Sequence, residues 1–137
     1  MTKNKQHILL VDDDHNLLLS LKKLLSLKGY ESDTALGGED AICQLNKKEY
    51  DLVLLDLHMP DVNGYDVMQH IKSDTNKPAI VIISGETSFE AARKACSGGS
   101  YAFLSKPYNI DELFSPVKNA LKEMHHQKQN LFMQKQL

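Results

Sequence analysis

Hydrophobic residues gather in four short, uninterrupted runs along the chain. None of these runs alternates apolar with polar residues, as a strand with one face in water would, so each predicts a strand buried on both faces. A fifth strand is predicted at 31–35, a polar stretch between two helical segments that suits the edge of a sheet. The four apolar runs cover residues 8–11, 52–55, 79–83 and 102–104.

Apolar residues at helical spacing follow each predicted strand. The clearest helix begins after Asp14, which we expect to cap it, and ends near Gly29. Its apolar positions are Leu17, Leu18, Leu21, Leu24 and Leu25. The other helices are marked by Ala41, Ile42 and Leu45, by Val67, Met68 and Ile71, by Phe89, Ala92, Ala95 and Cys96, and by Leu113, Val117, Leu121 and Met124.

The last of these helices carries its own start signal. Asn109 can cap it, and Glu112 stands at the position that completes a capping box. Pro116 lies past the first turn, where it removes a backbone hydrogen bond to Glu112, so we expect it to kink or delay the helix. Residues 126–137 continue as a polar, helix-favouring run, which is either a linker helix or a frayed tail.

Strict alternation of buried strands with amphipathic helices predicts a single doubly wound (βα)5 domain, with a five-stranded parallel sheet between two helical layers. In such a sheet, ligands bind outside the carboxyl ends of the strands. Chemically active side chains follow every predicted strand except the polar one. They are Asp12, Asp13 and Asp14, then Asp56, then Ser84, and finally Ser105 and Lys106 before Pro107.

Three of these carboxylates, on Asp12, Asp13 and Asp56, would repel one another at one edge of the sheet unless a cation joined them. Mg2+ prefers oxygen ligands and binds through a few carboxylates and phosphate oxygens. Carboxylates, a hydroxyl and a lysine around Mg2+ are typical of phosphoryl transfer. The phosphate-binding pattern GxxxxGK[ST] is absent from the sequence, which favours a covalent aspartyl phosphate over a bound nucleotide.

Four motifs stand at the predicted strand ends: VDDD at 11–14, LLDLHMPDVNG at 54–64, IISGE at 82–86 and FLSKP at 103–107. Together they resemble the receiver domain of two-component response regulators, the CheY-like superfamily. The resemblance covers about residues 7 to 125, and its signature positions occur in order at the predicted strand ends. It implies the flavodoxin-like strand order 2-1-3-4-5 and a phosphoacceptor switch of a two-component system.

The resemblance also implies roles for individual residues. Asp56 matches the phosphoacceptor, which receives a phosphoryl group from a histidine kinase or a histidine phosphotransfer protein. Asp12 and Asp13 match the acidic residues that hold Mg2+ together with Asp56, and the backbone carbonyl of His58 matches a further ligand. Lys106 matches the ammonium that pairs with the phosphoryl group.

Four further positions match residues that respond to the phosphoryl group. Ser84 matches the hydroxyl that turns toward it, and Phe103 matches the aromatic switch residue that turns inward afterwards. The side chains of His58 and Glu86 match the positions that tune dephosphorylation. The matched peptide bond, Lys106-Pro107, is usually cis in this family, a state that proline makes accessible.

The resemblance implies that phosphorylation changes the surface of helix 4, strand 5 and helix 5 and so regulates an output. Ala102 and the pair Gly98-Gly99 depart from the usual pattern beside this surface and bear on the choice of partner. We expect a receiver domain at 1–125, followed at 126–137 by a linker or tail leading to an output domain beyond this sequence. The output would act in cis or as a partner protein, and a phosphorylation-dependent homodimer is left open.

Composition narrows the alternatives. The chain has 137 residues, of which 42% are hydrophobic and 25% charged, as expected for one globular domain. Its net charge of -2 argues against direct binding to nucleic acid. Cys43 and Cys96 have no metal-binding spacing and are predicted to be free, buried thiols. No signal peptide or membrane span is apparent, so we expect a cytoplasmic protein.

Two other function classes are compatible with a carboxylate-rich sheet edge. A phosphatase of the haloacid dehalogenase type would use Asp56 as nucleophile, but its motif has a second aspartate where this chain has His58. An inactive, receiver-like docking module would be expected to lack one of Asp12, Asp13, Asp56 or Lys106, and all four are present. We therefore expect a switch that catalyses only its own Mg2+-dependent phosphorylation and dephosphorylation, not an enzyme with a separate substrate.

Overall fold

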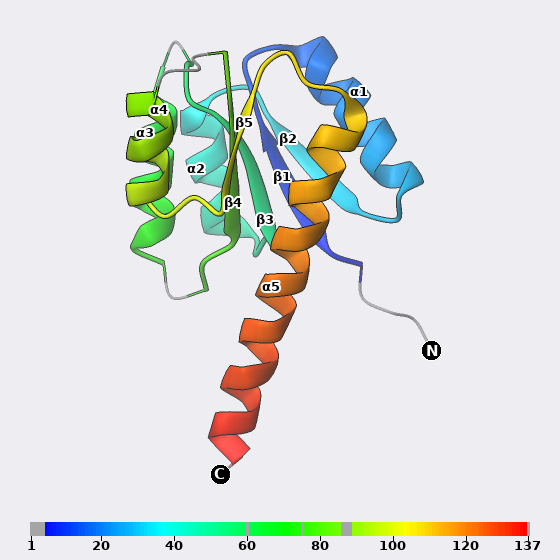
Figure 1. The fold of residues 1–137 in the computed structure, drawn as a ribbon, viewed down its shortest axis with the longest axis vertical. Helices are drawn as coiled ribbons and strands as arrows, with labels where there is room; N and C mark the ends of the chain where they lie inside the picture. Colours follow the sequence, from blue (N-terminus) through cyan, green and yellow to red (C-terminus); the bar gives the residue numbers. More distant parts are fainter. Residues whose placement is uncertain (1–4, 60, 75, 86–88, 137) are drawn as a thin grey trace.

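The computed structural model describes residues 5–59, 61–74, 76–85 and 89–136. Its five strands form one parallel sheet in the order β2-β1-β3-β4-β5, which confirms the predicted fold class and strand order (Figure 1). The strands are β1 (His7–Val11), β2 (Glu31–Ala35), β3 (Leu52–Asp56), β4 (Ala79–Ser84) and β5 (Ala102–Ser105). The helices are α1 (His15–Leu27), α2 (Gly38–Lys47), α3 (Gly64–Lys72), α4 (Phe89–Ser97) and α5 (Ile110–Gln136).

Helices cover both faces of the sheet. Figure 1 shows α1 and α5 on one side and α2, α3 and α4 on the other. Alternate residues of β1 enter different cores: Leu9 and Val11 pack under α2, α3 and α4, whereas Ile8 and Leu10 pack under α1 and α5. All four side chains are 0–2% exposed. This two-sided burial explains why the central strands lack apolar-polar alternation.

The two edge strands are less buried than the three central ones. In β2, only Ala35 is fully buried, as expected for a polar edge strand. In β5, Ala102, Phe103 and Leu104 are each only partly buried, so the prediction of a strand buried on both faces was wrong there. The reason is the strand order, which gives β5 a neighbour on one side only.

The predicted helix starts are confirmed. Asp14 Oδ1 accepts a hydrogen bond from the backbone N–H of Leu17 at 3.1 Å. Asn109 Oδ1 accepts from the N–H of Glu112 at 2.9 Å, and Glu112 Oε1 accepts from the N–H of Asn109 at 3.2 Å. This capping box begins α5 at once, and the helix runs through Pro116 without a break, so the expected delay does not occur.

The cysteines are not buried. Cys43 and Cys96 are free thiols, as predicted, but both are exposed on their helices. Cys43 lies two residues after the buried Ala41, and Cys96 lies one residue after the buried Ala95. Because an α-helix turns about 100° per residue, those offsets carry the thiols away from the core.

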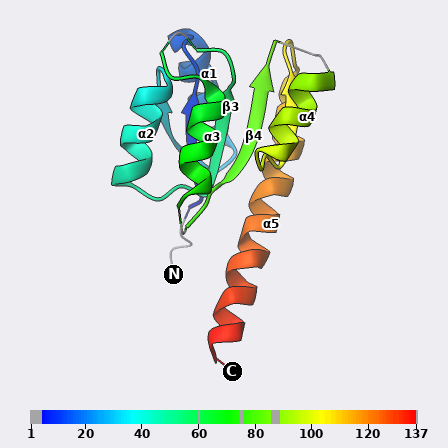
Figure 2. The same cartoon turned by 90° about the vertical axis from the view of Figure 1, so that its left-hand side faces the viewer.

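The long helix α5 extends well past the sheet, as Figures 1 and 2 show. Residues 126–136 are helical and continuous with the part of α5 that packs on the sheet. One side-chain contact reaches back from this extension: Lys128 Nζ lies 3.0 Å from Asp51 Oδ1, just before β3. No helix among the described residues is long and apolar enough to cross a membrane.

Candidate metal centre at the carboxyl edge of the sheet

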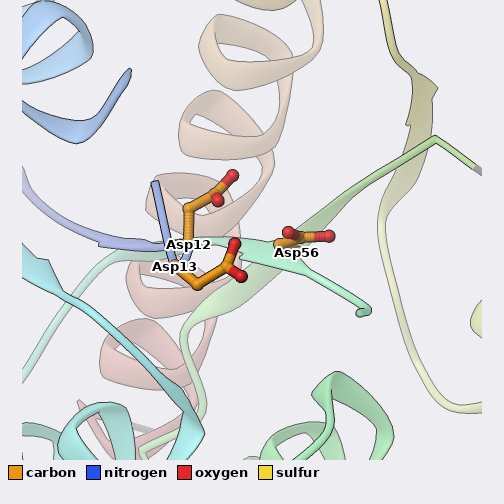
Figure 3. A group of neighbouring side chains, drawn as sticks. All are labelled: Asp12, Asp13 and Asp56. Atoms are coloured by element: carbon orange, nitrogen blue, oxygen red, sulfur yellow. The ribbon is translucent and has the colours of Figure 1, made fainter. Parts of the chain in front are cut away.

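Three carboxylates converge at the carboxyl ends of β1 and β3 (Figure 3). Asp12 and Asp13 directly follow β1, and Asp56 is the last residue of β3. One oxygen from each of the three lies within 4.8 Å of the others. Asp12 and Asp56 are both 5% exposed, whereas Asp13 is exposed. The predicted acidic cluster is therefore assembled by two neighbouring parallel strands.

Backbone hydrogen bonds fix the two buried carboxylates. The N–H of Asp12 donates to the carbonyl of Ala35 on β2 at 3.2 Å, while Asp12 Oδ1 accepts from the N–H of Asp14 at 3.0 Å. Asp56 Oδ1 accepts from the N–H of His58 at 3.2 Å. Each carboxylate thus has one oxygen held by the loop that follows its own strand, which leaves Oδ2 to face other groups.

Lys106 brings a positive charge to both of the remaining oxygens. Its Nζ lies 3.1 Å from Asp12 Oδ2 and 3.5 Å from Asp56 Oδ2. The backbone N–H of Lys106 donates to the carbonyl of Ser84 at 2.8 Å, which ties the end of β5 to the end of β4. The Lys106-Pro107 peptide bond is cis, as predicted.

The site's electrostatics show that one ammonium does not balance the buried carboxylates. Burial raises the pKa of Asp56; the His58 N–H and the Lys106 charge lower it in part, and Asp12 raises it further. Burial alone would lower the pKa of Lys106, but hydrogen bonds and charges from Asp12 and Asp56 outweigh burial and raise it. Ionised Asp56 is therefore costly in the protein without a further cation.

The donor set fits a hard divalent cation. Three carboxylate oxygens from Asp12, Asp13 and Asp56 lie close enough to share one ion, and one of the three residues faces solvent. Mg2+ takes oxygen ligands and keeps several waters, so a cluster that is partly open suits it. The clustered acidic residues are thus of the kind that binds Mg2+.

The other predicted site residues lie around this cluster to different extents. Ser84 is fully buried at the end of β4, one residue beyond Ile83, which pairs with Asp56 across the sheet. Phe103 is partly buried and packs against the core under α2, α3 and α4. His58 is exposed in the loop after β3. Glu86 lies outside the described residues.

The loop after β3 also carries a residue that the sequence did not single out. Asp61 Oδ1 and Oδ2 accept from the N–H groups of Gly38 and Glu39 at 3.2 and 3.1 Å, so Asp61 caps α2 from 23 and 22 residues away. One sign of this arrangement lies in the sequence: Gly37, at the N-cap position of α2, has no side chain, so a side chain from another segment has to cap the helix.

Close backbone approach explains Gly64, at the start of α3. A Cβ at this position would lie 2.7 Å from the carbonyl oxygen of Asp56 and 2.7 Å from Leu57 Cα. The N–H of Gly64 donates to the carbonyl of Leu57 at 3.0 Å. Gly64 therefore lets α3 begin against the backbone that carries Asp56.

Comparison with known proteins agrees with this site. A family model described as the response regulator receiver domain matches residues 8–118. The chain therefore belongs to the response regulator receiver domain family, and it functions as a receiver domain of two-component systems. This membership decides against the haloacid dehalogenase alternative.

Similar proteins include transcriptional regulators. The chain is 35% identical to the transcriptional regulatory protein ZraR of Salmonella typhimurium over 88% of this chain and 27% of that protein. It is 32% identical to the transcriptional regulatory protein GlrR of Escherichia coli over 90% of this chain and 28% of that protein. The chain thus spans about a quarter of the length of these two relatives.

Solved structures of receiver domains superpose closely. The receiver domain of a putative LuxO repressor protein from Vibrio parahaemolyticus matches with a TM-score of 0.87 and 28% identity, covering 91% of this chain and 96% of that one. The response regulator TrrA of Thermotoga maritima, in complex with Mg2+ and a beryllium fluoride, matches with a TM-score of 0.75 and 32% identity, covering 84% of this chain and 98% of that one.

Proposed function

We propose that this receiver domain accepts a phosphoryl group on Asp56 from the phosphohistidine of a histidine kinase or a histidine phosphotransfer protein. The observation that carries the proposal is the gathering of Asp12, Asp13 and Asp56 within 4.8 Å, with Lys106 against two of them. A docking module without chemistry would not need two buried carboxylates that repel each other.

Asp12, Asp13, Asp56 and the backbone carbonyl of His58 are the groups we assign to holding Mg2+. When bound, the ion neutralises the carboxylates and the negative charge of the incoming phosphoryl group. The acid cluster of this chain supports the assignment, as does the solved complex of a similar response regulator, TrrA, with Mg2+ and a beryllium fluoride.

In the proposed reaction, Asp56 Oδ2 is the attacking atom, because Oδ1 is held by the His58 N–H. A P–O bond forms to Asp56 as the P–N bond of the donor breaks, and the departing imidazole keeps the electron pair and takes up a proton. Lys106 then leaves Asp12 and pairs with the phosphoryl oxygens. Positioning and charge neutralisation supply most of the catalysis in such a transfer.

The response to phosphorylation follows from the same edge of the sheet. The Ser84 hydroxyl turns to the phosphoryl oxygens, and Phe103 moves further into the core that it already contacts. The side chains of His58 and Glu86 set how fast water removes the phosphoryl group. This autocatalytic cycle is the only chemistry that we assign to the domain.

We propose that phosphorylation changes the surface of α4, β5 and α5 and that the output recognises this surface. We assign residues 1–125 to the receiver domain and 126–137 to a helical linker that leads to an output domain; a separate output protein or a phosphorylation-dependent homodimer would use the same surface. The unbroken α5 and the greater length of the curated relatives support the linker. We assign this signalling to the cytoplasm.

The test is intact mass spectrometry after incubation with acetyl phosphate and Mg2+. We expect one added phosphoryl group in the wild type and none in Asp56→Asn or after chelation of the metal. Asp40→Asn, which removes an exposed carboxylate on α2, is the matched control and should be phosphorylated normally. Failure of the wild type to gain mass would overturn the proposal.

A further inference from the structure

Small residues pack α4 against the rest of the domain. Among the side chains of α4 that the structure describes, the buried ones are Ala91 and Ala95, which are 5% and 0% exposed. The helices α1, α3 and α5 bury larger apolar side chains, such as Leu18, Met68 and Leu113. Because the hydrophobic free energy rises with the apolar area that is buried, two alanines hold a helix less firmly than these larger side chains do.

The turn that ends α4 approaches α3 through a glycine. A Cβ at Gly98 would lie 2.7 Å from Met68 Cε on α3. Ala91, Ala95 and Gly98 are spaced by four and three residues, which is the spacing of one helix face. Small residues interlock with a neighbouring helix less than large ones do, so this face resists a sliding movement of α4 less.

Lys94 joins the same helix to α3 by a contact between side chains. Its Nζ lies 4.1 Å from the centroid of the Tyr65 ring, well inside the distance of about 6 Å at which a cation is attracted to an aromatic face. Tyr65 is partly buried against the core under α2, α3 and α4, which restrains its ring, whereas Lys94 is exposed. The contact therefore joins a restrained ring on α3 to a weakly packed helix.

Both helices that carry the contact follow strands that end at the acid cluster. Tyr65 comes directly after Gly64, whose N–H donates to the carbonyl of Leu57 beside Asp56, at the end of β3. The helix α4 is the first element after Ser84, at the end of β4. In the proposed function the Ser84 hydroxyl turns to the phosphoryl group. Displacement of α4 relative to α3 would then act directly on the contact.

The contact belongs to the unphosphorylated arrangement of the site. In this structure Lys106 pairs with Asp12 and Asp56, as it does before phosphorylation in the proposed function. Since the Lys94 ammonium is already close to the ring, displacement of α4 along α3 carries it off the ring face and weakens the attraction.

We propose that the Lys94–Tyr65 contact is a latch, which holds α4 in the unphosphorylated arrangement and opens when Asp56 is phosphorylated. A contact made in one of two states shifts the equilibrium toward that state. A domain without the latch therefore switches more readily. This inference rests on the proposed phosphorylation of Asp56 and on the proposed change at the surface of α4, β5 and α5.

The first test is hydrogen exchange of backbone amides in the protein without Mg2+. Lys94→Met keeps the length of the side chain and removes its charge, and Tyr65→Leu keeps an apolar side chain and removes the ring face. We expect the amides of α4 to exchange roughly two- to fivefold faster in both variants, the effect of losing one cation–π contact at an exposed site. The amides of α1, on the other face of the sheet, should keep their wild-type rates.

The second test is the affinity for beryllofluoride, a phosphoryl mimic, in the presence of Mg2+. Each variant should bind it roughly two- to fivefold more tightly than the wild type. Tyr65→Leu combined with Lys94→Met should gain no more than either change alone, because the same contact is lost in all three. Arg93→Gln is the matched control: it removes a neighbouring positive charge that pairs with Glu90 within α4, and it should leave the affinity unchanged.

The outcomes separate the inference from the function on which it rests. Wild-type exchange of α4 in Lys94→Met would overturn the latch. Faster exchange with an unchanged beryllofluoride affinity, or an equal gain in Arg93→Gln, would overturn its role in the switch. Failure of the wild type to bind beryllofluoride with Mg2+, or equal binding by Asp56→Asn, would instead overturn the proposed function and the inference with it.

Discussion

The Lys106 ammonium lies 3.1 Å from Asp12 Oδ2, in a pair where the carboxylate is buried and the lysine side chain is 31% exposed. Lys106 reaches Asp56 as well, at 3.5 Å, so one flexible side chain serves two carboxylates from different strands. In the protein without metal, Lys106 supplies the countercharge that Mg2+ would otherwise provide. In the proposed function, Lys106 leaves Asp12 for the phosphoryl oxygens.

Lys106→Ala should show whether Lys106 stabilises the metal-free protein without contributing to Mg2+ binding. We expect the metal-free protein to lose roughly 1–3 kcal/mol of stability, because two buried carboxylates lose a charged partner. Mg2+ affinity should not fall, since the ammonium competes with the cation for the same oxygens. Calorimetric titration with Mg2+ and urea unfolding measure both effects. Lys48→Ala, which breaks an ion pair with Asp33 away from the site, is the control, and a marked loss of Mg2+ affinity in Lys106→Ala would contradict this division of roles.

Asp56→Asn should stabilise the metal-free protein. Burial raises the pKa of Asp56 in the folded state, so the folded protein binds this proton more tightly than the unfolded chain does. The resulting stabilisation is present below the unfolded pKa of about 3.9 and is lost as pH rises through the folded value. At pH 7 the charge therefore opposes folding.

Thermal unfolding of Asp56→Asn measures this effect. At pH 7 without metal we expect a Tm rise of roughly 2–6 °C, the shift that about 1 kcal/mol produces in domains of this size. The difference should shrink as pH falls toward 4, where the wild-type carboxyl becomes protonated. A lower Tm for Asp56→Asn at pH 7 would show that the pair with Lys106 outweighs burial.

The contribution of Asp61 to stability should depend on pH in the opposite direction to that of Asp56. Hydrogen bonds from the Glu39 N–H and other backbone N–H groups hold the pKa of Asp61 below its usual range, although burial acts in the opposite direction. Its contribution is present above the unfolded pKa and is lost as pH falls through the lower, folded value. Asp61→Ala should therefore lower the Tm at pH 7, with the loss disappearing in acid. Asp74→Ala, in the turn after α3, serves as the control, and an unchanged Tm for Asp61→Ala would contradict the capping role.

Gly64→Ala tests the close approach of α3 to the end of β3, where Asp56 lies. The added Cβ meets backbone atoms of Asp56 and Leu57 at 2.7 Å, so the backbone must shift, at a cost of roughly 1–3 kcal/mol. We expect lower stability in urea unfolding and slower labelling by acetyl phosphate, because the shift falls on the residue that is labelled. Gly85→Ala is the matched control, since a Cβ there meets nothing within 4 Å. Equal stability and equal labelling rates in the two variants would contradict the role given to close backbone approach at Gly64.

The sheet and its acidic edge could be predicted because both depend on local pattern. Buried parallel strands are continuous apolar runs, and the residues that follow them share one edge, so Asp12 and Asp56 could be placed together from the sequence. The partial burial of β5 depends instead on its place in the strand order. The exposure of Cys43 and Cys96 depends on a rotation of one or two residues about a helix, which a loose apolar pattern does not fix.

Contacts between distant loops were out of reach of the sequence. Asp61 caps α2 because two loops 22 or more residues apart meet, and no local signal names the partner. The burial of the Tyr108 hydroxyl, which has no hydrogen-bond partner among the described residues, was equally out of reach. A tyrosine after Lys106-Pro107 gives no sign of which way its oxygen points.

Reductive trapping identifies the residue that carries the phosphoryl group directly. Borohydride converts an aspartyl phosphate to homoserine, which peptide mass spectrometry places in the sequence. After treatment with acetyl phosphate and Mg2+, we expect homoserine at position 56 and unmodified aspartate at Asp12 and Asp13. Homoserine at either of those two positions, with Asp56 intact, would contradict the assignment of Asp56.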